Sequence, residues 1–322
     1  MTIPVTEALP RSIPRTSVII TSFNYAEYLP TAIASVLAQS DPDFELIIVD
    51  DGSTDGSREI ARRFTDPRIR VLLQPNRGLG AARNAGLEAA RGNFITFLDA
   101  DDIWVPTKLA AQVAFMLSHS DTGLIYCRFG VIDPDGAILA SGPSRLALKP
   151  SGFIIRSLLV GNVIGTPSTI CFRRELIEDG ALRFDESQMY MEDWHFYLRL
   201  AMQTRIQFLD STLAYHRRHG RNMSRQIQTA TAQALRTAQF GLVLARQHLN
   251  LSDKSLRRLE RQALAYVEAV TAREYAKAGH LAQTRIHAAR ALRYAPLRTR
   301  EQLLYWFASI GWMPKAITIR LK

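Results

Sequence analysis

Short apolar runs alternate with helix-like segments through the first half of the chain, and this alternation most constrains its fold. The apolar runs cover residues 18–20, 45–49, 69–73, 94–98 and 123–129. Helical patterns span residues 27–38 and 79–91, and a further helix is expected to begin near Pro106. Strands that are apolar along their whole length are typical of parallel sheets covered by helices on both faces. The sequence therefore predicts an α/β fold with a mostly parallel sheet.

The pattern changes in the second half of the chain. Residues 133–136 predict a tight turn, a strand is expected near residues 168–172, and a helix is expected over residues 192–202. From about residue 226 the apolar residues recur at helical spacing. We therefore expect an N-terminal tail over residues 1–15, an α/β domain over residues 16–225 and a basic, all-helical region over residues 226–322.

The net charge of +10 is concentrated in the C-terminal third of the chain. Residues 221–322 contain 18 Lys and Arg but 5 Asp and Glu, whereas residues 1–220 have a net charge of −3. Such asymmetry indicates either an anionic partner, such as a membrane surface or nucleic acid, or a solvated helical surface. Cations flank the aromatic segment 303–313, which fits peripheral membrane association as well as packing on the α/β domain or on a second subunit. The sequence therefore leaves undecided whether the protein forms a homo-oligomer.

The sequence also bears on the compartment. Residues 1–15 lack the apolar core of a signal peptide, and no segment reaches the ~18 uninterrupted apolar residues that a membrane span needs. Cys127 and Cys171 lie in apolar stretches without metal-binding spacing, as expected of buried thiols in a reducing compartment. We expect a cytoplasmic protein, with a peripheral position at the inner face of the cell membrane left open.

Three of the expected strands end in polar side chains, at residues 21–24, 50–53 and 99–102. Ligands of open α/β sheets bind beyond the carboxyl ends of the strands. Asp99 and Asp101 are two residues apart, so they share one face of an extended segment. Mg²⁺ and Mn²⁺ favour oxygen ligands and commonly take one or two carboxylates together with phosphate oxygens. These acids predict a divalent-cation site, with a simple turn as the alternative and no assigned role for Asp102.

The remaining polar segments indicate a particular ligand less specifically. Asp50 and Asp51 should point in opposite directions, so one is expected to bind loop backbone and the other to face a cleft, unless both cap the loop. Two glycines in residues 76–84 permit a close approach to a helix N-terminus, which is a weak anion site. Arg83 in this segment could reach a phosphate or hold the acids in place.

Four segments in this order and spacing resemble the motifs of family 2 glycosyltransferases with a GT-A fold. They are Thr-Ser-Phe-Asn at 21–24, Val-Asp-Asp-Gly-Ser-Thr-Asp at 49–55, Asn-Arg-Gly-Leu-Gly-Ala-Ala-Arg-Asn at 76–84 and Phe-Leu-Asp-Ala-Asp-Asp at 97–102. The resemblance covers roughly residues 15–225. It implies a Rossmann-like mixed sheet, mostly parallel, and transfer of a sugar from a nucleotide-diphosphate donor, usually with inversion at the anomeric carbon.

The resemblance also implies roles for the residues at the matching positions. Thr21 and Phe23 match the place that contacts the nucleobase, with Asn24 beside them at the donor, although the family often has Tyr at Phe23. Asp51 matches an acid that binds the base or ribose, and Arg83 a basic residue near the donor. Asp99 and Asp101 match a D-x-D pair that holds a divalent cation, Mg²⁺ or Mn²⁺, on the diphosphate; Asp101 is the more direct ligand.

Two later segments are matched in the same way. Met191–Trp194 resembles the family's Glu-Asp segment, which implies that Asp193 is the general base and that Glu192 and Trp194 lie near the acceptor. A carboxylate there can deprotonate an acceptor hydroxyl as it attacks the sugar. Residues 216–219 resemble a Tyr-Arg-x-His segment, with His216 in the place of Tyr. It implies that Arg217 or Arg218 contacts phosphate and that His219 binds the cation or the diphosphate. For Glu192 and Asp193 the alternative is an acid pair at the N-terminus of a helix. For residues 216–219 the alternative is a basic linker into the helical region.

These observations favour a metal-dependent, inverting glycosyltransferase. Its expected partners are a nucleotide-sugar donor, with UDP favoured, and a saccharide or lipid-linked acceptor in cell-surface polysaccharide or glycoconjugate synthesis; no nucleic acid is expected. A sugar nucleotidyltransferase shares the sheet type, but it would carry a Gly-rich basic loop after the first strand, where this chain has residues 21–25. A binding or scaffold protein that has lost catalysis is the other alternative, and the acids Asp99, Asp101 and Asp193 count against it. The donor's base and sugar, the acceptor and its linkage stay undetermined.

Overall fold

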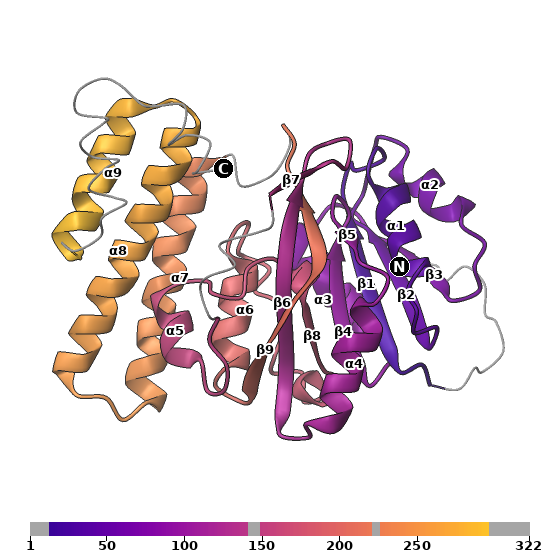
Figure 1. Ribbon diagram of the computed structural model, residues 1–322, viewed down its shortest axis with the longest axis horizontal. Coiled ribbons are helices and arrows are strands. Elements are labelled where there is room, and N and C mark those ends of the chain that lie inside the picture. The colour runs from indigo at the N-terminus through magenta and orange to yellow at the C-terminus, as the bar shows by residue number, and fades with distance from the viewer. Residues whose placement is uncertain (1–12, 141–148, 221–225, 296–322) are drawn as a thin grey trace. The chain divides into compact units, whose positions relative to one another are not determined.

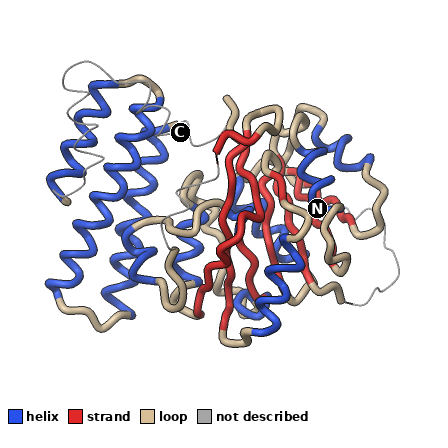
Figure 2. Tube along the Cα trace, in the orientation of Figure 1, coloured by secondary structure: helices blue, strands red, loops and turns tan. Residues whose placement is uncertain are grey.

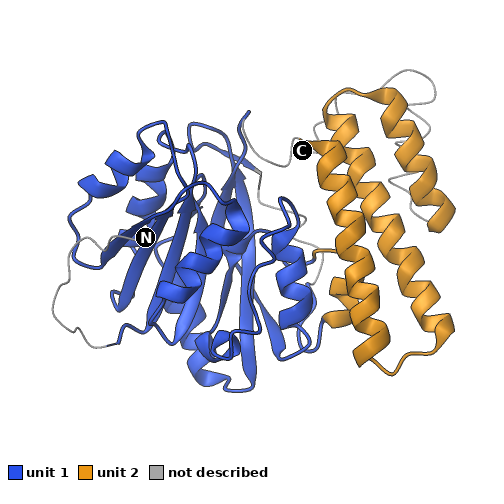
Figure 3. Cartoon of the chain, turned by 180° about the vertical axis from the view of Figure 1, so that it is seen from behind, with its two compact units in different colours: residues 1–154, 163–220 blue, residues 155–162, 221–322 orange. Residues whose placement is uncertain are grey.

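The computed structural model describes residues 13–140, 149–220 and 226–295. These residues fall into two compact units, one within residues 1–154 and 163–220 and the other within residues 155–162 and 221–322 (Figure 3). The predicted α/β domain includes residues 155–162. In the structure they form helix α5 (Ile155–Val160), which packs against helices of the second unit and therefore belongs with them.

The first unit is built on a single mixed sheet (Figures 1 and 2). Its strands are β1 (Thr16–Ser22), β2 (Phe44–Asp50), β3 (Ile69–Leu73), β4 (Phe94–Asp99), β5 (Ile103–Trp104), β6 (Thr122–Ile132), β7 (Ile138–Ala140), β8 (Ile170–Arg173) and β9 (Arg205–Arg217). Among the described residues the nine strands have the order β3-β2-β1-β4-β8-β6-β9-β5, and β7 pairs with β6. The predicted α/β fold is confirmed.

Strand direction brings several carboxyl ends to one edge of the sheet. β3, β2, β1 and β4 are parallel, and β8 is antiparallel to both β4 and β6. β6 therefore runs in the direction of β4, and β9 is parallel to β6. The C-terminal residues of β1, β2, β4, β6 and β9 thus share one edge, where ligands of open α/β sheets bind.

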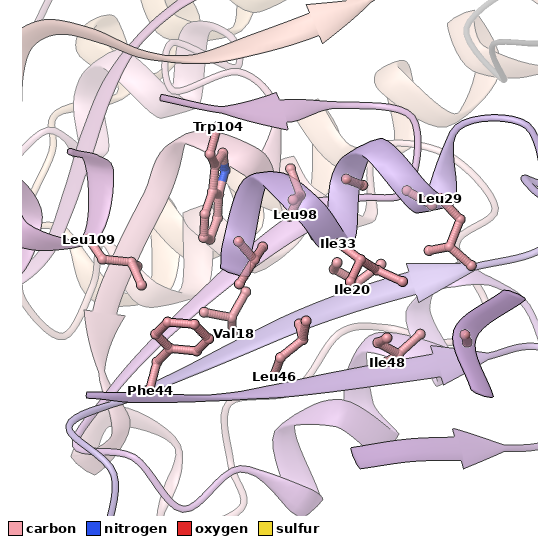
Figure 4. Close-up of a cluster of buried hydrophobic side chains, with 14 of the residues drawn as sticks. Val18, Ile20, Leu29, Ile33, Phe44, Leu46, Ile48, Leu98, Trp104 and Leu109 are labelled. Atoms are coloured by element: carbon pink, nitrogen blue, oxygen red, sulfur yellow. The ribbon is translucent and has the colours of Figure 1, made fainter. Parts of the chain in front are cut away.

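Helices cover both faces of the sheet. They are α1 (Leu29–Leu37), α2 (Ser57–Arg63), α3 (Leu79–Ala89), α4 (Lys108–Ser118) and α6 (Glu192–Leu200), with short 3₁₀ turns η1 (Pro167–Thr169) and η2 (Arg174–Ile177). Successive residues of β1 point to opposite faces. Val18 and Ile20 pack with Ile33 of α1 in one buried cluster (Figure 4). Truncating such a side chain to Ala costs about 2–5 kcal/mol of stability.

The opposite face of the sheet carries α3 and α6. Gly86 of α3 lies so close to β1 that a Cβ atom there would be 2.4 Å from the Ile19 side chain. A glycine at this position therefore sets the short spacing between helix and sheet. On α6, Phe196 stacks on Phe184 with ring centroids 4.3 Å apart and meets Phe172 of β8 at 5.9 Å. These rings hold the middle of α6 over the sheet.

Strand β9 is the main element that the sequence does not predict. Its 13 residues pair with β6 along most of their length, and the pairing contains register shifts near Cys127 and Arg128. Asp210 and Ser211, at its centre, are exposed. The strand therefore shows neither a continuous apolar run nor a regular alternation.

The second unit is helical. α7 (Ile227–His248), α8 (Asp253–Lys277) and α9 (Leu281–Tyr294) form antiparallel pairs, and α8 also contacts α5. The side chain of Ser252 accepts a hydrogen bond from the Ser255 amide and caps the start of α8. None of the helices in the described residues is long and apolar enough to span a membrane. The predicted tail up to residue 12 and the aromatic segment 303–313 lie outside the described residues.

Candidate active site

Arg83 joins two walls of the candidate site. Its side chain is 2% exposed, Nη2 donates to Asp99 Oδ1 at 2.9 Å and Nη1 donates to Glu192 Oε1 at 2.5 Å. Burial opposes the positive charge, but the carboxylates of Asp99, Glu192 and Asp193 outweigh it and raise the pKa of Arg83 above its usual value. Of the two roles that the sequence leaves open for Arg83, these contacts match the holding of acids in place.

Asp193 lies in the first turn of α6, where the predicted base is expected. Met191, the residue just before α6, has a φ of +61°, a left-handed conformation that is unusual for a side chain of this size. Asp193 Oδ1 accepts a hydrogen bond from the Trp194 amide at 2.6 Å. Burial, followed by the charge of Glu192, raises the pKa of Asp193 to about 7, while Arg83 acts in the opposite sense. A carboxylate with this pKa can accept a proton near neutral pH.

The neighbours of Asp193 on α6 face the interior. Trp194 is 1% exposed, so its ring packs in the core and presents no surface to an acceptor, in contrast to the role that the resemblance implies. Tyr197, one turn after Asp193, is fully buried, and its hydroxyl has no hydrogen-bond partner in the described structure. Burial, and then the charge of Asp193, raise the pKa of Tyr197, so the phenol stays neutral.

The acids that follow β4 divide into separate tasks. Asp99 is bound to Arg83 through Oδ1, and its Oδ2 accepts a hydrogen bond from Thr166 Oγ1 at 2.9 Å. Asp101 Oδ2 lies 2.9 Å from His219 Nε2, and both side chains are nearly buried. Asp102 is completely buried and bonded to Ser168, His216 and the Arg217 amide. The structure thus gives Asp102 a place that the sequence does not predict.

Asp101 and His219 form the part of the site that best fits a divalent cation. A carboxylate oxygen and an imidazole nitrogen are both ligands that Mn²⁺ accepts, and Mg²⁺ favours the oxygen. The part of the chain that the structure describes contains no cluster of three or more His, Cys, Asp or Glu side chains suited to a metal. Asp99 is directed to Arg83 and Thr166, so it is less suited to be a direct ligand than Asp101.

The loops after β1 and β2 form the predicted nucleotide side of the site. Thr21 is buried near the end of β1, opposite Asp99 in the register of β4. The Phe23 side chain is 42% exposed. Asn24 has a φ of +59°, and its Oδ1 accepts a hydrogen bond from the Thr54 amide at 2.8 Å. Asn24 therefore ties the two loops together beside the exposed Phe23 ring.

Asp50 at the end of β2 and Asp51 just after it both bind loop backbone. The Asp51 carboxylate accepts hydrogen bonds from the Arg77 and Gly78 amides, each at 2.9 Å, and from Gln74 Nε2 at 2.7 Å. Asp50 Oδ2 accepts one from the Ser53 amide at 3.3 Å. Of the two alternatives that the sequence leaves open, these bonds match the one in which both acids cap the loops that lead to the helices.

Arg217 and Arg218 are placed at the end of β9. Arg217 is buried, its Nε donates to the Asp101 carbonyl at 2.9 Å and its Nη1 donates to the Pro134 carbonyl at 2.7 Å. Its guanidinium thus ties the β4 turn to the loop after β6, where a phosphate contact was expected. Arg218 is half-buried, and its amide donates to the Ile132 carbonyl at 2.9 Å.

Several residues of the site escape prediction from the sequence. Thr166 precedes η1 and binds Asp99, whereas Ser168 lies within η1 and binds Asp102. Their only signal in the sequence is a polar run before the β8 strand. Burial alone would lower the pKa of His216, but the charge of Asp102 and its hydrogen bond outweigh burial and raise that pKa to about 9. His216 is therefore a cation at neutral pH, bonded to Asp102 at 3.0 Å.

Comparison with known proteins gives consistent matches. Residues 17–180 match the model of the family described as glycosyl transferase family 2. An uncharacterized glycosyltransferase of Nostoc sp. is 34% identical over 239 residues, which are 73% of this chain and 74% of the relative. The UDP-Glc:alpha-D-GlcNAc-diphosphoundecaprenol beta-1,3-glucosyltransferase WfgD of Escherichia coli is 30% identical over 191 residues, covering 59% and 71%.

Solved structures with low sequence identity share the fold. Staphylococcus aureus TarS 1-349 in complex with UDP-GlcNAc aligns with a TM-score of 0.64 at 21% identity, over 95% of this chain and 89% of that one. The mannosyltransferase PcManGT from Pyrobaculum calidifontis, in complex with GDP-Man and Mn²⁺, aligns with a TM-score of 0.58 at 20% identity, over 93% and 87%.

Proposed function

The chain belongs to glycosyl transferase family 2 and is a glycosyltransferase, and from this premise we propose its reaction in detail. It transfers a sugar from a nucleotide-diphosphate donor, with UDP favoured, to a hydroxyl of a saccharide or lipid-linked acceptor, with inversion at the anomeric carbon. One observation carries this proposal: Arg83 bonds both to Asp99 at the end of β4 and to Glu192 beside Asp193. It ties the candidate base to the acids expected at the diphosphate.

Asp193 is the proposed general base. Inverting transfer needs a carboxylate that removes the acceptor's proton while its oxygen attacks the sugar carbon opposite the leaving diphosphate. The pKa of Asp193, raised to about 7, makes it a stronger base than an ordinary carboxylate and leaves much of it ionised at neutral pH. Glu192 is nearly buried and bound to Arg83, so its proposed role is to position the acceptor side through that ion pair.

Asp101 and His219 are the proposed protein ligands of Mg²⁺ or Mn²⁺, with Asp99 close to the same diphosphate. When bound, the cation offsets the negative charge that develops on the leaving diphosphate. Mn²⁺ in the complex of the mannosyltransferase PcManGT supports a divalent cation in this fold. In our proposal, Arg217 acts on the turn at Asp101. Arg218 remains the proposed contact to the phosphate oxygens.

The nucleoside is proposed to bind over the loops after β1 and β2. The exposed ring of Phe23 offers a stacking surface for the base, next to Thr21 and the loop held by Asn24. The carboxylate oxygens of Asp51 already accept hydrogen bonds from the amides of residues 77 and 78. In this proposal Asp51 therefore affects donor binding indirectly, by holding this loop in place. UDP is favoured because the structurally similar TarS is known in complex with UDP-GlcNAc, and because the relative WfgD is named as a glucosyltransferase that uses UDP-Glc.

The acceptor is proposed to be saccharide or lipid-linked, in cell-surface polysaccharide or glycoconjugate synthesis. The name of the relative WfgD specifies a diphosphoundecaprenol acceptor, which is a lipid. Lys254, Arg257 and Arg258 are exposed on the first turns of α8, and this charge supports a peripheral position at an anionic membrane surface.

Calorimetric titration of UDP with and without Mn²⁺ tests the donor site. We expect Mn²⁺ to strengthen UDP binding, and Asp101→Ala to abolish that enhancement. Asp193→Ala should bind Mn²⁺ and UDP like the wild type and lose sugar transfer. Normal turnover by Asp193→Ala would refute the assigned general base.

Screening a panel of nucleotide sugars for donor hydrolysis would then identify the nucleobase and the sugar of the donor. The absence of hydrolysis and transfer from every donor would favour a binding protein.

A further inference from the structure

Both carboxylate oxygens of Asp102, in the turn after β4, accept hydrogen bonds from the protein. Asp102 is fully buried, its Oδ2 accepts a hydrogen bond from Ser168 Oγ at 2.6 Å, and its Oδ1 accepts from His216 Nδ1 at 3.0 Å and from the Arg217 amide at 3.1 Å. Such a carboxylate has no surface left for a substrate or an ion. Its contacts therefore act on the protein itself.

These contacts join three segments that are distant in the sequence. The turn after β4 supplies Asp102, η1 supplies Ser168, and the end of β9 supplies His216. Ser168 Oγ also accepts a hydrogen bond from the Asp99 amide at 3.1 Å, and the Asp102 amide donates to the Asp99 carbonyl at 3.0 Å. The turn is thus closed on itself and bonded to both neighbouring segments.

The two residues proposed to hold the cation lie on either side of this junction. Asp101 precedes Asp102 directly, and His219 follows His216 by three residues. The distance of 2.9 Å between Asp101 Oδ2 and His219 Nε2 therefore depends on how the turn and the end of β9 are held together. Arg217 adds a bond of 2.9 Å from its Nε to the Asp101 carbonyl.

We propose that Asp102, with His216 as its partner, is a positioning residue that sets the geometry of Asp101 and His219 for the cation and the donor's diphosphate. The inference rests on the proposed function, because it assumes that Asp101 and His219 bind the cation. Groups that orient metal ligands from behind commonly change metal affinity or activity 10–100-fold when they are replaced, roughly the effect expected here.

Asp102→Asn tests the carboxylate. The substitution keeps the shape but replaces one acceptor oxygen by a donor, which then faces either Ser168 or the donors on β9. We expect Mn²⁺ to bind the UDP-loaded protein about 10–100-fold more weakly, measured by electron paramagnetic resonance of free Mn²⁺. In the metal-free protein, the ¹⁵N shifts of the His219 ring should also move, because its distance to Asp101 changes.

His216 offers an independent variant that leaves Asp102 in place. His216→Phe keeps an aromatic ring beside Phe129, whose centroid lies 6.3 Å away, and removes the donor to Asp102. His216→Asn restores a donor at the position of Nδ1. We expect weak Mn²⁺ binding in His216→Phe and substantial recovery in His216→Asn. This pair also decides the question if Asp102→Asn fails to fold.

Asp133→Asn is the matched control. Asp133 also follows a strand at this edge, but its Oδ1 accepts a hydrogen bond from the Ala137 amide in an exposed turn. It should bind Mn²⁺ with UDP as the wild type does. Wild-type Mn²⁺ affinity in both Asp102→Asn and His216→Phe, with affinity lost in Asp101→Asn, would overturn the inference and leave the proposed function intact. Wild-type affinity in Asp101→Asn would instead refute the proposed cation site.

Discussion

Arg83 and Glu192 lie 2.5 Å apart, Nη1 to Oε1, although 109 positions separate them in the sequence. Both side chains are nearly buried, with 2% and 8% exposure. The pair fixes the first turn of α6 to α3, and the second guanidinium nitrogen extends this connection to Asp99. The location of the candidate base Asp193 thus depends on the guanidinium group of Arg83, which in our proposal contacts neither the donor nor the acceptor.

Replacing Arg83 by Met should destabilise the protein strongly. The variant leaves the Glu192 carboxylate buried without its partner, and loss of one partner of a buried pair costs about 3–5 kcal/mol. Urea denaturation at neutral pH measures the change. Arg77→Met is the control, because Arg77 and Glu186 form an exposed pair that is worth less than about 1 kcal/mol. Equal losses in the two variants would contradict the role assigned to Arg83.

The rate of transfer should fall below about pH 7. Asp193 must be ionised to accept a proton, and burial raises its pKa to about 7, so acid removes the active form. At pH 6 about one tenth of the wild-type molecules should carry the active base, and kcat should drop about tenfold per pH unit below that. A profile measured with saturating donor checks this, and a flat profile down to pH 5 would exclude Asp193 as the base.

Because of His216, the stability of the protein should decrease as the pH rises above neutral. Its pKa rises from 6.5 unfolded to about 9 folded, because the charge and hydrogen bond of Asp102 outweigh the effect of burial. The folded state therefore holds a proton more tightly, and its stabilisation is complete below about pH 6.5 and is lost as pH rises through about 9. Unfolding free energies of the wild type should decline over this window, and those of His216→Asn should decline less. Parallel pH curves would contradict the assignment.

Phe23→Ala should weaken donor binding without loss of stability. The ring is 42% exposed, so its removal takes little from the core, whereas stacking of a base on an aromatic ring is worth about 1–3 kcal/mol. We expect the KM for the donor to rise about 5-fold to 150-fold, with Phe23→Tyr close to the wild type. If Phe23→Ala leaves the KM unchanged, the base binds elsewhere.

The sequence predicts the parts of the fold that depend on local pattern. The apolar runs that become β1, β2, β3 and β4 lie where they are expected, and the family indicated by the four motifs is confirmed. That membership also decides between a glycosyltransferase and a sugar nucleotidyltransferase, which the sheet type alone does not. β9 was missed because its exposed centre and its register shifts against β6 hide the strand pattern.

Side-chain direction in the site could not be predicted from spacing. The sequence leaves Arg83 either a phosphate or the acids as partners, and it suggests a phosphate for Arg217. In the structure, partners more than 80 positions away bind both guanidinium groups. Trp194 stands beside Asp193 in the sequence, but the helix directs it into the core. Such outcomes depend on tertiary contacts, which residue type and spacing do not contain. The assignments of the individual site residues therefore stay predictions until the variants above are measured.

The pairing of β6 with β9 also constrains how the chain reaches its native state. β6 begins at Thr122 and β9 at Arg205, so this parallel pair closes only after more than 80 residues have been added to the chain. Contacts of such long sequence separation form slowly, because the entropy of a large loop is lost before they are made. During synthesis on the ribosome, β1 to β4 can assemble early, whereas the junction of Asp101 and His219 has to be among the last contacts of the first unit to form.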